Sequence, residues 1–257
     1  MADCQSDRDR NVVYSKSPKT CFVAHFDVLG MRTLIAQSGS TAWSIMCSLF
    51  EIGTEALEIS LKLAVSGKVI EGRVERLAFS DTVFFHTKTA SEEDLCAIAT
   101  TAAGFLAGAG AKGIPVRGGI ARGEVYVDTR IQVFTGRAVL DAVVAGESAK
   151  WLGIVATDEV ARLAAPGPLK FLDGKPLFRA CNIPLAEGKS CPGFAMDWPY
   201  LLLKPKESFP VTSEECYRPF SKTFGPFCDL IPDVRTKYEN TTLFVNDCVA
   251  GRAVQGR

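Results

Sequence analysis

This sequence of 257 residues has no long apolar run, few histidines and no excess of charge of either sign. No apolar run reaches the roughly 18–20 residues that a membrane-spanning helix needs, so we expect no contact with a membrane. The 29 basic and 29 acidic residues balance each other, which excludes the strongly basic footprint of a nucleic-acid-binding protein. A nucleotide stays possible as a ligand, because a small site needs only local charge.

The two histidines, His25 and His86, leave little material for a histidine-rich metal site, and the nine cysteines form no CxxC pair. A thiolate zinc site needs closely spaced cysteines, and a disulfide framework needs an oxidising compartment. The N-terminal segment 1–19 is polar and has no apolar signal core. We therefore expect reduced, partly buried thiols, a flexible lead-in over 1–19 and a cytoplasmic protein.

What is present is the composition of a globular protein, with 47% hydrophobic and 23% charged residues. The composition of the chain changes at Pro166, because from there on prolines repeatedly interrupt the apolar pattern. We therefore divide the chain into the lead-in, a core over 20–165 and a C-terminal extension over 166–257 that packs on the core. We expect the extension to add strands to the core, with a possible strand at 200–203, and to end in a helix near 234–249.

Apolar periodicity predicts the elements of the core. We expect strands over 21–30, 74–87 (a hairpin with its tip at 80–81), 114–134 (a pair broken near Gly123) and 154–156, and helices over 41–63, 91–111, 136–152 and 158–164. Helices that interrupt paired strands in this way are typical of an α/β (α+β) sandwich of the ferredoxin-like type. The expected sheet is mixed but mainly antiparallel, with flanking helices.

The first expected strand ends in an aspartate, Asp27, shortly before Gly30. Alternation places Asp27 on the same strand face as Val23 and His25. Aspartate is unfavourable in a strand, and a buried carboxylate without a partner is costly. Functional sites also gather at strand ends beside a glycine turn. A functional carboxylate and a turn cap for residues 29–32 both remain open on this evidence.

A second aspartate, Asp81, stands at the tip of the apolar hairpin, where a plain turn role is the alternative. Two aspartates from adjacent strands of one sheet can converge. A carboxylate pair favours a hard cation such as Mg²⁺ or Mn²⁺, with phosphate oxygens completing its shell. Two such cations, about 3.5–4 Å apart, can activate an attacking oxygen and stabilise a leaving one. The turn at 28–32 would offer backbone amides to the phosphates.

A glycine-rich segment over 117–123 carries two arginines, Arg117 and Arg122. Its glycines allow close approach of another backbone or a bulge in the strand pair. Guanidinium groups suit the neutralisation of a triphosphate. A solvated strand end, with glycines that serve the twist, is the alternative.

Three segments together resemble the motifs of class III nucleotide cyclases, in order and in spacing, over residues 20–160 approximately. They are Phe26-Asp27-Val28-Leu29-Gly30, Phe79-Ser80-Asp81 and Arg117-Gly-Gly-Ile-Ala-Arg122-Gly123. With the segment Gly136-Arg-Ala-Val-Leu-Asp-Ala142 and Glu147, the chain is similar to the bacterial pyrimidine cyclases of Pycsar antiphage systems.

The resemblance implies that Asp27 and Asp81 bind two metal ions, Mn²⁺ in preference to Mg²⁺, and that the backbone carbonyl of Val28 completes one ion's shell. It also implies a head-to-tail homodimer in which the partner subunit completes each site. Because both aspartates lie on one chain, two equivalent sites are expected. The implied phosphate contacts are Gly30, Met31 and Arg32.

The departures from the family's pattern bear on the substrate. Purine cyclases of this class place a lysine four residues before the second metal aspartate, where this chain has Leu77, and a base-reading aspartate where it has Val133. The Asn and Arg that steady the transition state would fall at Leu140 and Val144, which donate no hydrogen bond. Weakened readout of ATP and GTP fits a pyrimidine substrate. We count Leu77, Arg117 and Arg122 as nucleotide-binding positions, and Arg73, Arg76, Arg117, Arg122 and Arg137 as candidate sources of the missing charge.

We therefore expect a uridylate cyclase, in which the 3′-hydroxyl of UTP attacks the α-phosphate to form cyclic UMP and release pyrophosphate. Catalysis would depend on positioning and charge stabilisation. In Pycsar systems the product activates a separate effector protein during phage infection. A cytidylate cyclase that makes cyclic CMP from CTP is the near alternative, because the choice of uracil comes from the resemblance as a whole. A catalytically silent nucleotide-binding domain and a plain dimerisation module are the others.

Overall fold

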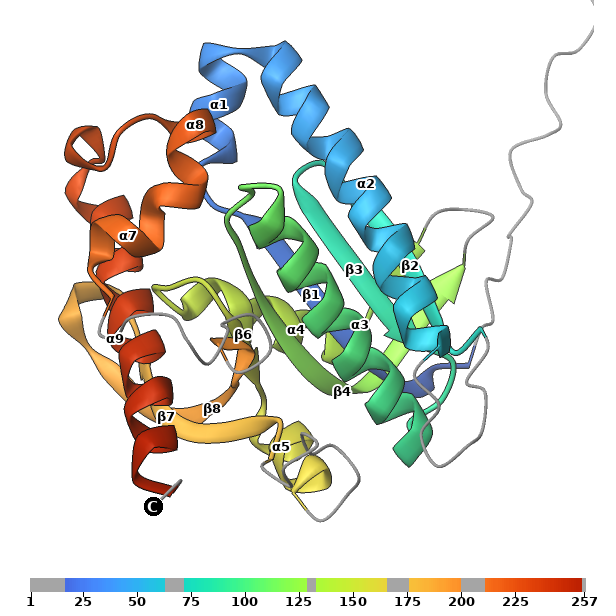
Figure 1. Cartoon of the computed structure of the whole chain (residues 1–257). Helices are drawn as coiled ribbons and strands as arrows, with labels where there is room; N and C mark the ends of the chain where they lie inside the picture. Colours follow the sequence, from blue (N-terminus) through green and yellow to red (C-terminus); the bar gives the residue numbers. More distant parts are fainter. Residues whose placement is uncertain (1–16, 63–71, 129–132, 166–175, 200–210, 256–257) are drawn as a thin grey trace, which may run out of the picture.

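A computed structural model describes residues 17–62, 72–128, 133–165, 176–199 and 211–255 (Figure 1). The strands are β1 (Lys19–Val28), β2 (Val74–Phe79), β3 (Thr82–Thr87), β4 (Val116–Asp128), β5 (Val133–Thr135), β6 (Ile154–Ala156), β7 (Phe178–Pro184) and β8 (Ser190–Met196). They form one eight-stranded sheet in the order β2-β3-β1-β4-β6-β8-β7, with β5 paired to β4 outside that path. β4 and β6 pair in parallel and the other pairs are antiparallel. The predicted mixed, mainly antiparallel sheet is confirmed.

The described helices flank this sheet. They are α1 (Met31–Gln37), α2 (Gly39–Lys62), α3 (Glu92–Ala111), α4 (Arg137–Ser148), α5 (Asp158–Ala164), α7 (Ser213–Tyr217), α8 (Ser221–Phe224) and α9 (Pro232–Gln255). The start of α3 follows from its sequence, because Ser91 and Asp94 form a capping box in which each side chain accepts from the other residue's backbone amide. The short helix α1, directly after the glycine turn, is an element that periodicity did not predict.

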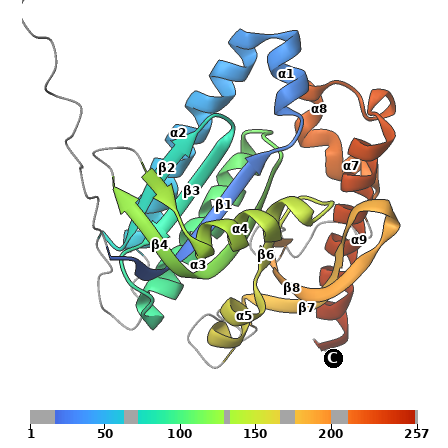
Figure 2. The same ribbon diagram turned by 180° about the vertical axis from the view of Figure 1, so that it is seen from behind.

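Alternation along β1 decides what each face of the sheet buries. Phe22, Ala24 and Phe26 belong to the main core beneath α2 and α3. Cys21 and Val23 face the other way, into a smaller cluster with α4. Figures 1 and 2, seen from opposite sides, show α2 and α3 on one face of the sheet and α4 on the other. Asp27 therefore belongs to the α4 face.

The helix α4 lies very close to β4 because small residues meet there. A methyl group at Gly119 would clash with the carbonyl oxygen of Ala142, and one at Gly146 would clash with the backbone of Gly118. Of the two uses of glycine left open for this segment, close backbone approach is the one observed. The predicted break near Gly123 is wrong, because Gly123 pairs in regular register with Cys21 and β4 runs on without a bulge.

The C-terminal extension continues the sheet, as predicted, since β8 pairs with β6 and β7 pairs with β8. Its last helix, α9, is longer than the predicted helix. Phe244 of α9 packs on Trp151, with ring centroids 4.6 Å apart, in a second buried cluster. The possible strand at 200–203 lies outside the described residues.

One helix in the described part of the chain, α3, is long and apolar enough by length and composition to cross a membrane. In the structure 61% of its apolar window is buried, and it packs against β1, β3 and β4. It is therefore a core helix of this fold.

Candidate functional site

Asp27 lies at the carboxyl end of the interior strand β1, between Thr82 of β3 and Arg117 of β4. The chain then turns at Gly30, whose φ of 84° is a left-handed conformation that glycine adopts without strain. A side chain at Gly30 would also press on the ring of Phe224 in α8. Among the described residues the Asp27 carboxylate accepts hydrogen bonds from Arg117 and from no amide of the turn. It is therefore not the turn cap that the sequence left open.

Asp81 follows Ser80 at the tip of the hairpin that joins β2 to β3. Ser80 has a φ of 55°, a conformation uncommon outside glycine, and the turn is correspondingly tight. Because Asp27 pairs with Thr82, the residue after Asp81, the hairpin brings both aspartates to the same end of the sheet. This is the convergence that the two motifs predict.

Arg117 holds Asp27 in place. Its Nε and Nη2 donate to Oδ2 of Asp27 at 3.2 and 3.0 Å. Its Nη1 donates to the carbonyl oxygens of Glu147 and Ala149 at 2.7 and 3.3 Å. The Arg117 and Asp27 side chains are only 13% and 19% exposed. A buried ion pair needs such additional hydrogen bonds to offset the loss of solvation.

The charges around Asp27 oppose one another. Burial raises the pKa of the Asp27 carboxyl, and the guanidinium of Arg117 lowers it; the charge of Asp81 raises it further, and the ammonium of Lys237 lowers it. Asp81 and Lys237 therefore both lie close enough to Asp27 for their charges to be felt there. A carboxylate beside a second carboxylate favours the binding of a cation between them.

Lys237 comes from α9, in the C-terminal extension, where the sequence identified no candidate site residue. Its side chain is 13% exposed, and its ammonium lies 3.0 Å from a carboxylate oxygen of Asp233. The hydrogen bond from Lys237 lowers the pKa of Asp233, and the charges of Lys150 and Arg117 lower it further. The one sequence signal was an acid–lysine pair four residues apart, which is common on solvated helix faces.

Arg122 lies apart from this group. It lies five residues after Arg117 on β4, and side chains an odd number of residues apart on a strand point to opposite faces of the sheet. Its Nη1 donates to Glu159 of α5 at 2.6 Å. Leu77 of β2 pairs with Phe84 of β3, and two strands, β3 and β1, separate it from Arg117 on β4. Within one subunit the structure thus brings together Asp27, Asp81 and Arg117, and it does not bring Arg122 to them.

The predicted phosphate contacts lie where β1 passes into α1. Gly30 and Arg32 are exposed, whereas the Met31 side chain is buried in the main core, so a phosphate contact at this position would need its backbone. No side chain caps the start of α1, and its first turn holds no acid. His25, two residues before Asp27, is buried, and burial together with the charge of Arg117 lowers its pKa to about 4.

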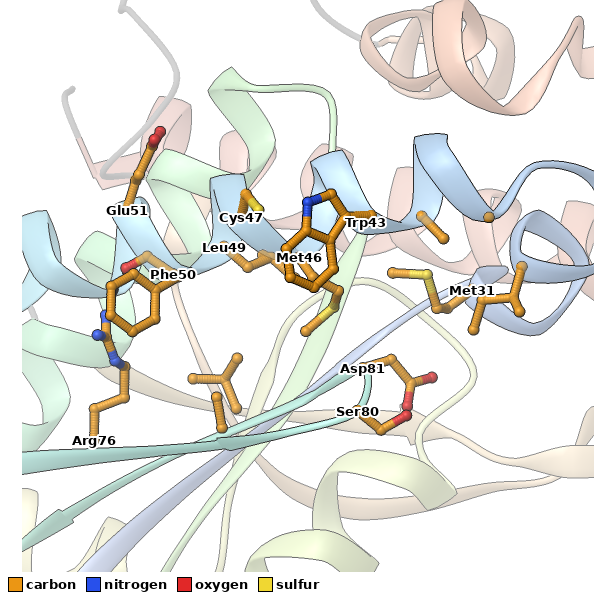
Figure 3. A pocket seen from close by; sticks show the side chains of 15 residues that line it. Met31, Trp43, Met46, Cys47, Leu49, Phe50, Glu51, Arg76, Ser80 and Asp81 are labelled. Atoms are coloured by element: carbon orange, nitrogen blue, oxygen red, sulfur yellow. Dashed lines mark hydrogen bonds between the residues drawn. The ribbon is translucent and has the colours of Figure 1, made fainter.

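A groove of about 660 Å³ opens beside Asp81, between α1 and α2 on one side and the β2–β3 hairpin on the other (Figure 3). Trp43 and Phe50 of α2 line it and are 72% and 60% exposed. At its far end the Arg76 guanidinium lies 3.9 Å from the centre of the Phe50 ring and donates to the Phe50 carbonyl at 2.5 Å. Arg76 thus ties the edge strand to α2.

The residues present fit a metal that arrives with a nucleotide. No group of three or more His, Cys, Asp and Glu residues comes together in the described ranges. Asp27, Asp81 and the Val28 carbonyl offer an all-oxygen donor set, which suits Mg²⁺ or Mn²⁺. Such ions keep waters and take substrate phosphates as ligands, so two carboxylates are sufficient protein donors.

The outer face of α4 exposes apolar side chains. Leu140 and Val144, four residues apart on α4, are 57% and 55% exposed. Val133 and Tyr126 are also 41% and 40% exposed, but they lie on the opposite face of the β4–β5 pair from Val127 and Phe134, which pack toward α4. The two positions at which the resemblance expects hydrogen-bonding side chains are therefore open apolar ones.

No protein-family model matches this sequence, and no curated protein matches it. The fold does match solved structures. The catalytic core of a rhodopsin-guanylyl cyclase with converted specificity, in complex with ATPαS, has a TM-score of 0.50 at 13% identity, over 70% of this chain and 96% of that one. A class III adenylyl cyclase-like ATP-binding protein from Pseudomonas aeruginosa has a TM-score of 0.44 at 11% identity, over 58% of this chain and 35% of that one. The first likeness shows a cyclase-core fold; the second is too weak to add to it.

Proposed function

We propose that this chain is a class III nucleotide cyclase that converts UTP into cyclic UMP and pyrophosphate in the cytoplasm. The observation that supports this most is the meeting of Asp27, Asp81 and Arg117 at one end of the sheet, in a fold like that of a cyclase catalytic core. The 3′-hydroxyl attacks the α-phosphate, its proton passes to water and pyrophosphate leaves, so no covalent enzyme intermediate is needed.

Each residue of the group has a role in this proposal. Asp27, Asp81 and the Val28 carbonyl would hold two divalent ions, Mn²⁺ in preference to Mg²⁺. When bound, the ions supply charge stabilisation at the reacting phosphate. When the nucleotide binds, the Arg117 guanidinium releases the Asp27 carboxylate and donates to phosphate oxygens instead. A planar guanidinium suits both partners. The backbone at 30–32 contacts the phosphates.

A pyrimidine substrate is supported by the residues at the base-reading positions. Leu77 and Val133 have no group that could hydrogen-bond to the edge of a purine. The preference for UTP over CTP follows the resemblance to Pycsar cyclases. In such a system cyclic UMP is a second messenger that activates a separate effector protein in antiphage defence.

A head-to-tail homodimer, with sites at its interface, is supported by the exposed apolar surface of α4. Leu140 and Val144 are exposed apolar residues four apart on α4, and apolar side chains grouped on one surface are typical of interfaces between proteins. Val144→Asp should convert the dimer into a monomer and abolish cyclisation, as measured by sedimentation equilibrium and product formation. Leu243→Asp is the matched control, because Leu243 is 69% exposed on α9, outside this surface. A Val144→Asp variant that stays dimeric and active would contradict the arrangement.

The activity is tested with each of the four radiolabelled ribonucleoside triphosphates in the presence of Mn²⁺. We expect cyclic UMP from the wild type, no product from Asp81→Ala, and normal activity from Glu55→Ala, which removes an exposed acid of α2. Equal cyclisation of ATP would exclude the pyrimidine preference, and cyclic CMP as the main product would favour the cytidylate alternative.

A catalytically silent nucleotide-binding domain is the second candidate. The observation that favours it is the apolar character of Leu140 and Val144, where other cyclases place hydrogen-bonding side chains. Nucleotide binding without any cyclic product in the assay above would establish this alternative.

A further inference from the structure

The C-terminal helix α9 reaches the end of β1 at which Asp27 lies. Tyr238 of α9 is buried in one cluster with Leu29, two residues beyond Asp27, and with Leu152. Lys237 directly precedes Tyr238 in α9. The packing of this cluster therefore brings Lys237 to the level of the candidate site.

Hydrogen bonds fix this position. Asn240 donates to the carbonyl oxygen of Lys150 at 2.9 Å, and the Leu152 amide donates to the hydroxyl of Thr241 at 2.8 Å. The stretch of chain just before Lys150 supplies the two carbonyl oxygens that anchor Arg117. The segment 147–152 therefore contacts both α9 and Arg117, the ion-pair partner of Asp27.

The burial of Lys237 is not explained by its ion pair. Its side chain is only 13% exposed, although lysine is among the residue types that lie mostly at the surface. Its partner Asp233 is 65% exposed and lies four residues away on the same helix, and pairs of that kind contribute little to stability. The charge of Lys237 also acts on Asp27, where it adds to the larger effect of Arg117 against burial.

We propose that Lys237 is a polyphosphate-binding residue, supplied to the site by the C-terminal helix of the same chain. In the structure its ammonium is paired with Asp233, and a triphosphate held at Asp27 exchanges this partner for phosphate oxygens. A compact ammonium on a flexible stem suits such an exchange. Lys237 would then supply cationic charge that α4, with Leu140 and Val144, lacks. The inference depends on the proposed function, because it names a further residue of the same site.

The test is equilibrium binding of 3′-deoxy-UTP, which lacks the attacking hydroxyl, in the presence of Mn²⁺ by isothermal titration calorimetry. Lys237→Met should raise the Kd about tenfold or more, since a charge-assisted hydrogen bond is lost, and Lys237→Arg should restore most of the affinity. Asp233→Asn should lower the Kd, because it frees the ammonium. A purely structural pair would not give these opposite directions, because both substitutions would break the same contact.

Lys189→Met is the matched control, because Lys189 is also paired with an acid, Glu187 at 2.6 Å, but is 71% exposed at the turn between β7 and β8. Its Kd should equal that of the wild type, and thermal unfolding checks that every variant folds. Unchanged binding by Lys237→Met, or equal losses in Lys237→Met and Asp233→Asn, would overturn the inference, as would a wild type that does not bind 3′-deoxy-UTP. Binding with the expected pattern but no cyclic product from UTP would contradict the proposed function alone.

Discussion

The two aspartates of the candidate site come from neighbouring strands but have unlike surroundings. Asp27 lies on the interior strand β1, is 19% exposed and is held by Arg117, with Lys237 close by. Asp81 lies at the tip of the edge hairpin, beside the groove lined by Trp43, and its side chain has no hydrogen bond among the described residues. The difference predicts that substitution of Asp27 lowers the stability of the fold, whereas substitution of Asp81 leaves it nearly unchanged.

Substitution of either aspartate has the largest expected effect. Asp27→Asn and Asp81→Asn should each lower cyclic UMP formation by about 10²–10³-fold or more, since each removes charge that the transition state needs. Asp27→Asn should also lower the free energy of unfolding by about 2 kcal/mol, because it leaves the Arg117 charge largely buried without its partner. Asp81→Asn should change it by less than about 0.5 kcal/mol. Urea unfolding measures both values. Equal destabilisation by the two variants would contradict the claim that only Asp27 contributes to the stability of the fold.

Arg117→Gln removes the cationic partner of Asp27 and therefore tests the same ion pair. It should lower cyclisation about 10–100-fold through the loss of a charged phosphate contact. Binding of Mn²⁺ alone should become tighter, because the guanidinium no longer competes for the Asp27 carboxylate. Electron paramagnetic resonance of free Mn²⁺ measures this directly. Arg122→Gln, on the opposite face of β4, is the control and should leave Mn²⁺ binding unchanged. Weaker Mn²⁺ binding in Arg117→Gln would show that the arginine positions Asp27 and does not compete with the metal.

The surroundings of Asp27 should also respond to pH through His25. Its pKa is 6.5 in the unfolded chain and about 4 in the folded protein, because burial and the charge of Arg117 disfavour the protonated ring. The unfolded chain therefore binds a proton where the folded protein does not. The free energy of unfolding should fall by about 3 kcal/mol as the pH is lowered through the range between the two pKa values, and no further below them.

Urea unfolding across this pH range, with His25→Leu beside the wild type, measures the contribution of His25. The variant should show a shallower dependence on pH. Some dependence should remain, because burial also lowers the pKa of His86. An identical dependence in the variant and the wild type would contradict a role for His25.

The glycine turn between Asp27 and α1 gives the smallest expected effect. Gly30→Ala should lower the free energy of unfolding by about 1–2 kcal/mol, because a side chain is strained at a left-handed φ. Gly110→Ala in α3 is the control; its new methyl group would meet nothing within 4 Å, and it should raise stability by about 0.5–1 kcal/mol. Thermal unfolding measures both variants, and a neutral Gly30→Ala would show that the turn tolerates another conformation.

The fold could largely be predicted because most of its elements bury a single face. The helix expected over 41–63 is observed as α2, Gly39–Lys62, and the hairpin turns at the expected Ser80–Asp81. The predicted break in β4 was wrong for a physical reason. A glycine weakens an isolated strand, but Gly123 lies against Ala138 of α4 and pairs with Cys21 of β1, and these contacts are invisible to local periodicity.

The sequence by itself determined the local features of the candidate site: an aspartate at a strand end, a glycine that allows the turn, and an acid at a hairpin tip. Only the tertiary structure decided which cations meet them. Arg117 and Asp27 are 90 residues apart and pair through strand register, whereas Arg122, in the same motif, is turned to the opposite face and pairs with Glu159. Lys237 reaches the site because α9 buries Tyr238 beside Leu29. Spacing along the chain specifies neighbours within a few residues, and contacts across the whole chain depend on how all the buried surfaces pack together.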